Sequence, residues 1–108
     1  MTNEQFNKIV ENQLNICKDI LTLKRMDYDG VEGDRFNAFK RAATLQNCNI
    51  KQALAGMMAK HTTSVYDMCE SNETYSKAMW QEKITDHINY LLLLRAIIEE
   101  ETTDDKCK

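Results

Sequence analysis

The chain has 108 residues, of which 43% are hydrophobic, and its formal net charge is −3. This length fits one domain with a modest buried core, and the apolar content argues against a disordered chain. The sequence contains no proline and only three glycines, which disfavours β-sandwiches and β-barrels because those folds need frequent turns. The composition therefore predicts an all-α protein.

The lengths of the apolar runs and the spacing of the cysteines predict where in the cell the protein is located. The longest apolar run, Leu91–Leu94, is much shorter than a membrane span, and the N-terminal residues do not resemble a signal peptide. The four cysteines form no CxxC pair, so we expect free thiols rather than a zinc site. These features predict a cytoplasmic protein without a membrane partner.

Apolar residues at spacings of three and four predict two helices in the first half of the chain. The first should span about residues 3–25 and should be interrupted by the Asp- and Gly-containing segment 26–34. The second should span about residues 35–46, with Asp34 as its N-cap. Its buried side is expected to hold Phe36, Phe39 and Ala43.

A third helix is predicted from residue 50 to about residue 69. Asn49 followed by Gln52 has the spacing of a capping box, which would open this helix. Its buried face should consist of Ile50, Leu54, Met57, His61, Val65 and Met68.

The fourth helix is expected over about residues 74–101. Its second half is apolar nearly all round, which indicates burial on more than one side. The helix would then lie at the centre of a bundle or in an interface, so we expect a homo-oligomer, most simply a twofold dimer. We expect a single helical-bundle domain of about four helices at residues 1–101 and a flexible acidic tail at residues 102–108.

One block of the sequence is basic although the chain as a whole is acidic. Residues 35–66 contain no acid, whereas the rest of the chain has nine basic and seventeen acidic residues, a net charge of −8. Such a block suits an anionic ligand, although it also fits an ordinary solvated helix face, and the acidic remainder disfavours general nucleic-acid binding. Its basic residues are Arg35, Lys40, Arg41, Lys51 and Lys60.

Two carboxylates and an amide share one narrow sector of the fourth predicted helix. Glu82, Asp86 and Asn89 lie on a line that Leu93 and Ile97 continue, which is typical of a groove wall. Carboxylates one turn apart suit Mg²⁺, which takes oxygen ligands and usually rests on one or two carboxylates plus substrate phosphates. The alternative is a pair of solvated acids near the start of the helix.

The third predicted helix contains three further residues of interest for a ligand site. His61 falls near the middle of its apolar face, where it is either a satisfied core residue or a ligand contact. Lys60 lies beside it on the flank. Gly56 inside a helix costs about 1 kcal/mol relative to alanine, and close approach of another helix or a ligand would explain it.

Three segments carry a family resemblance. The runs DRFNAFKRAATL, ALAGMMAKHTTSVYD and EKITDHINYLLLLRAII contain an R-x-x-x-F-x-x-A segment, an M-x-x-K-H helix and a D-x-x-N-Y helix. Over about residues 27–100 they resemble small bacteriophage and prophage proteins. They are also similar to nucleotide-modification-associated phage domains and, more distantly, to the all-α nucleotide pyrophosphohydrolases of the MazG and dimeric dUTPase type.

The pyrophosphohydrolase resemblance implies a MazG-like helical bundle and a nucleotide-like ligand. That family holds magnesium with E-E-x-x-E on one helix and E-x-x-D on the next. Here Glu82 and Asp86 resemble the second motif with one extra residue, whereas Lys60 and His61 stand where the first motif would place acids. The departure counts against hydrolysis more than against binding.

We therefore expect a phage-type protein that binds a nucleotide or a related phosphate compound in the cytoplasm of a bacterial host. Arg35, Lys60 and His61 would meet the anion. Glu82 and Asp86 are the candidate Mg²⁺ ligands and, if a pyrophosphohydrolase reaction occurs, its catalytic residues; Asn89 and Tyr90 would bind ligand beside them. The alternatives are a non-enzymatic phage–host conflict protein, which sequesters a signalling nucleotide or binds a host protein, and a purely structural oligomer.

Overall fold

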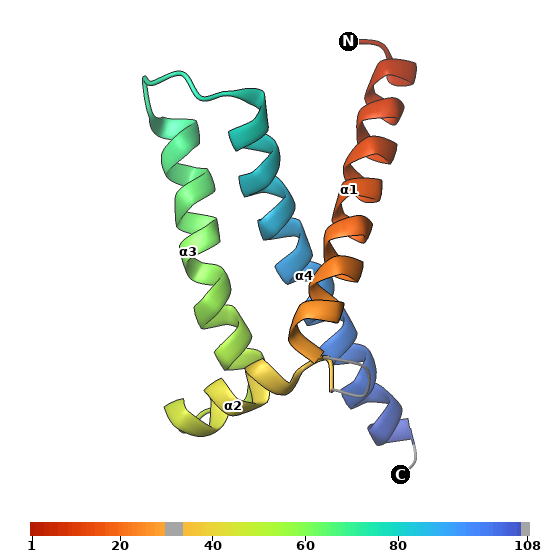
Figure 1. Ribbon diagram of the computed structural model, residues 1–108, viewed down its shortest axis with the longest axis vertical. Helices are drawn as coiled ribbons and strands as arrows, with labels where there is room; N and C mark the ends of the chain where they lie inside the picture. The colour runs from red at the N-terminus through yellow and green to blue at the C-terminus, as the bar shows by residue number, and fades with distance from the viewer. Residues whose placement is uncertain (30–33, 107–108) are drawn as a thin grey trace. The chain divides into compact units, whose positions relative to one another are not determined.

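A computed structural model describes residues 1–29 and 34–106, with side chains over residues 1–22 and 34–102. Every regular element within these ranges is a helix, which confirms the predicted all-α class. The elements are α1 (Asn3–Asp29), α2 (Asn37–Gln46), α3 (Ile50–Glu70) and α4 (Lys77–Lys106) (Figure 1). In the described part of the chain, none of these helices is long and apolar enough to cross a membrane.

The chain divides into two compact units, Met1–Arg35 and Phe36–Lys108, which are described separately. The first unit contains α1, and the second contains α2, α3 and α4. A single domain over residues 1–101 stays a prediction.

The first helix begins with a capping box that the sequence analysis did not predict. Thr2 Oγ1 accepts a hydrogen bond from the Gln5 backbone N–H at 3.1 Å, and Gln5 Oε1 accepts one from the Thr2 N–H at 2.9 Å. The helix continues to Asp29, four residues beyond the predicted end. The reason is that residues 26–29 are only mildly unfavourable in a helix.

The start of α2 differs from the prediction, and the proposed Asp34 cap is wrong. The N-cap residue is Phe36, and no side chain caps the helix. Phe36 is buried in the core of the second unit. Burying a phenylalanine contributes about 1.5–3 kcal/mol, which exceeds the roughly 1 kcal/mol of a typical N-cap, so packing fixes where this helix begins. The predicted buried side of Phe36, Phe39 and Ala43 is confirmed.

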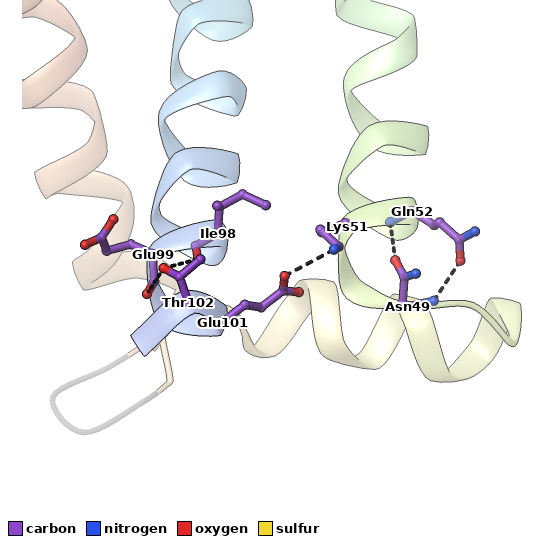
Figure 2. A network of polar contacts seen from close by, with 7 residues as sticks. All are labelled: Asn49, Lys51, Gln52, Ile98, Glu99, Glu101 and Thr102. Atoms are coloured by element: carbon purple, nitrogen blue, oxygen red, sulfur yellow. Dashed lines mark hydrogen bonds and ion pairs between the residues drawn. The ribbon is translucent and has the colours of Figure 1, made fainter. Parts of the chain in front are cut away.

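A tight turn joins α2 to α3. Asn47 adopts the left-handed conformation, with φ 54° and ψ 50°, and ends α2. The predicted capping box then opens α3 (Figure 2): Asn49 Oδ1 accepts from the Gln52 N–H at 2.8 Å, and Gln52 Oε1 accepts from the Asn49 N–H at 3.0 Å. This local chemistry confirms the predicted start of α3.

The fourth helix begins three residues later than predicted because Ser76 is its N-cap. Ser76 Oγ accepts a hydrogen bond from the Met79 N–H at 3.1 Å. The rings of Tyr75 and Trp80, on either side of this cap, meet edge to face with centroids 5.9 Å apart. Together these contacts form a hydrophobic staple around the serine cap. At its other end α4 continues to Lys106, five residues past the predicted boundary.

Helices α3 and α4 form an antiparallel hairpin, and α2 lies across the end at which α3 begins (Figure 1). The core between them is built from Phe36, Phe39, Leu54 and Ile97. The partly buried residues that pack against it are Ile50, Met57, Tyr90, Leu93 and Leu94. At the α2 end, Lys51 Nζ lies 3.1 Å from Glu101 Oε2 across the hairpin (Figure 2). The hairpin thereby places the middle of α3 against the middle of α4.

Candidate functional site

Two residues predicted for the site meet across the hairpin. His61 on α3 and Tyr90 on α4 lie with their ring centroids 4.8 Å apart and their planes inclined by 33°. Both side chains are partly buried. Tyr90 also meets the edge of Phe39, with centroids 6.4 Å apart, so the aromatic pair stands on the hydrophobic core. Packing against the hydrophobic core therefore fixes the position of the Tyr90 ring.

The surroundings of His61 are crowded with titratable groups. Burial lowers the pKa of His61 below its ordinary value of 6.5, and the positive charges of Lys60 and Lys83 and the neighbouring His87 lower it further. Asp86 acts in the opposite direction and raises the pKa of His61. The net effect favours the neutral imidazole, which can donate from one ring nitrogen and accept at the other.

A second histidine belongs to this cluster and was missed by the sequence analysis. Thr62 Oγ1 lies 2.9 Å from His87 Nε2, in a hydrogen bond between α3 and α4. The sequence contains a signal for this contact, because His87 directly follows Asp86. An antiparallel hairpin that turns at segment 71–76 brings the helical turn containing His87 beside His61 and Thr62. The cluster therefore holds two imidazoles rather than one.

Asn89 is the least satisfied polar residue of the predicted set. Its side chain is only 6% exposed, and neither its carboxamide oxygen nor its nitrogen has a hydrogen-bond partner among the described residues. A buried amide without partners costs about 1–3 kcal/mol, so natural proteins rarely keep one without a reason. Asn89 lies one turn after Asp86 and directly before Tyr90 on α4, and a ligand group would satisfy it.

The two candidate metal ligands have different surroundings. Asp86 is partly buried beside His61, whereas Glu82, one turn earlier on α4, is exposed. No group of three His, Cys, Asp or Glu residues is placed to hold a metal within the part of the chain that was searched. Glu82 and Asp86 alone would suit only an ion that takes its other ligands from water and from phosphate oxygens, which is typical of Mg²⁺.

The remaining basic residues do not join one cluster. Lys60 is exposed and lies close enough to His61 to lower its pKa. Arg35 belongs to the first unit, where its Nη2 donates a hydrogen bond to the Leu21 carbonyl at 3.0 Å. Close approach of another helix does not explain Gly56, because a Cβ atom at this position would meet nothing within 4 Å among the described residues. Close approach of a ligand stays a prediction.

This arrangement suits recognition of a small anion that carries an aromatic or hydroxylated group. Lys60 offers a positive charge, the His61–Tyr90 pair offers aromatic rings, and Asp86 offers a carboxylate for a hydroxyl, an amine or a metal ion. No protein-family model, curated protein or solved structure matches the chain.

Proposed function

We propose that this chain binds a nucleotide or a related phosphate-bearing small molecule at the middle of the α3–α4 hairpin. The observation that carries the proposal is the ring contact of His61 on α3 with Tyr90 on α4, two residues expected to bind ligand. Asp86, a third such residue, is near enough to His61 to raise its pKa. The buried and unpartnered amide of Asn89 supports it independently. Binding pockets typically combine such an apolar floor with a few polar groups.

Mg²⁺ is the proposed cofactor, and pyrophosphate hydrolysis of the bound nucleotide is a proposed secondary activity. Glu82 and Asp86 would hold the ion against the phosphates, and the ion would polarise a phosphoryl oxygen. Lys60 would face the anion. The role of Arg35 in ligand binding stays a prediction, because this residue belongs to the first unit, where it donates a hydrogen bond to the Leu21 carbonyl. A MazG-like bundle in a phage protein of the bacterial cytoplasm is the setting we propose, on the resemblance of the three sequence segments.

A second candidate is a non-enzymatic phage–host conflict protein, which would sequester a signalling nucleotide or bind a host protein. The observation that favours protein binding is the set of exposed apolar side chains on α4. The same side chains support our proposal that the chain forms homo-oligomers. A purely structural oligomer would use this surface and leave the His61 cluster without a ligand.

The test is a thermal-shift screen of purified protein against nucleoside mono-, di- and triphosphates and cyclic oligonucleotides, each with and without Mg²⁺. A ligand that binds only the native protein raises the melting temperature by mass action. We expect at least one phosphate compound to raise it and the matching nucleoside without phosphate to have a smaller effect. If no compound raises it at millimolar concentration, the ligand proposal fails and a protein-binding or structural role replaces it.

The fate of the ligand then separates the enzyme from the binder. A pyrophosphohydrolase converts a nucleoside triphosphate to the monophosphate and pyrophosphate, and here the reaction should require Mg²⁺. A sequestering protein releases its ligand unchanged when it is denatured by heat. Chromatography of the released compound decides between these outcomes.

A further inference from the structure

We draw no further inference here: the strongest candidate, the buried amide of Asn89 on α4, whose two polar atoms have no hydrogen-bond partner among the described residues, belongs to the candidate site already described.

Discussion

His61 and Tyr90 lie with their rings 4.8 Å apart, and the tyrosine joins the histidine to the hydrophobic core of the α3–α4 hairpin. A ligand that contacts this pair would therefore contact side chains whose positions are fixed by packing. Preorganised side chains lose less conformational freedom on binding than side chains on a loose surface.

Asp86→Asn and Lys60→Ala should each weaken binding of a phosphate ligand in the presence of Mg²⁺. Each variant removes one charge-assisted contact, commonly worth about 1.5–3 kcal/mol, or roughly a 10- to 150-fold change in the dissociation constant. Isothermal titration calorimetry with the best ligand from the screen measures the change. Asp67→Asn and Lys77→Ala are matched controls on exposed positions of α3 and α4 and should bind as wild type does.

The sign of the Asp86→Asn effect also tests the metal. If Asp86 met the anion directly without Mg²⁺, removal of its negative charge would strengthen binding. Weaker binding with Mg²⁺ and stronger binding without it would assign Asp86 to the metal. Unchanged affinity in both variants would place the ligand elsewhere on the molecule.

Asn89→Leu should stabilise the fold and impair ligand binding. The variant replaces a buried amide that has no partner among the described residues with an apolar side chain of similar size. We expect the free energy of unfolding to rise by about 1–3 kcal/mol in urea denaturation. Asn72→Leu, at an exposed position, should give no such gain. Loss of stability in Asn89→Leu would mean that the amide has a stabilising partner in solution.

Acidification should weaken the fold through His61. Because the pKa of His61 is lowered below 6.5, the unfolded chain binds more protons than the native one as the pH falls through and below that value. The contribution is complete above about pH 6.5 and is lost as the pH falls towards the native pKa of His61. Urea denaturation between about pH 7.5 and pH 5.5 should show a shallower pH dependence for His61→Gln than for wild type. Identical slopes would contradict the prediction.

Gly56→Ala should stabilise α3 by about 0.5–1 kcal/mol. The added Cβ has open space around it, and alanine reduces the entropy lost when the helix forms. A rise in the thermal midpoint without loss of ligand binding is the expected result. A fall in stability would indicate that a second molecule approaches the helix at this position.

Local signals in the sequence were sufficient for much of the fold. The Asn49–Gln52 capping box and the apolar spacing of α3 depend only on residues close in sequence, so they could be predicted. The start of α4 was wrong because Thr74 and Ser76 are both good caps, and the Tyr75–Trp80 contact selects the serine. The prediction of Asp34 as the N-cap of α2 was wrong because burial of Phe36 stabilises the fold by more than an N-cap hydrogen bond would.

The candidate site was harder to predict because it depends on the register of two helices. His61, Asp86 and Tyr90 were recognised one by one from their places on helix faces. The structure brings the rings of His61 and Tyr90 together and places Asp86 near enough to raise the pKa of His61. Thr62 and His87 were missed, since their hydrogen bond appears only when α3 and α4 are aligned about segment 71–76.

The short connection between α3 and α4 has a consequence for how fast the second unit folds. Most contacts between its helices join neighbours in sequence, α2 with α3 and α3 with α4, whereas the contact of Phe39 on α2 with Tyr90 on α4 is long-range. Because closing a short loop costs little entropy, the hairpin should close first near Ser71 and Ser76 and then zip towards the Lys51–Glu101 pair. Helical proteins with such local topology fold in microseconds to milliseconds, and stopped-flow or temperature-jump kinetics should place this unit in that range.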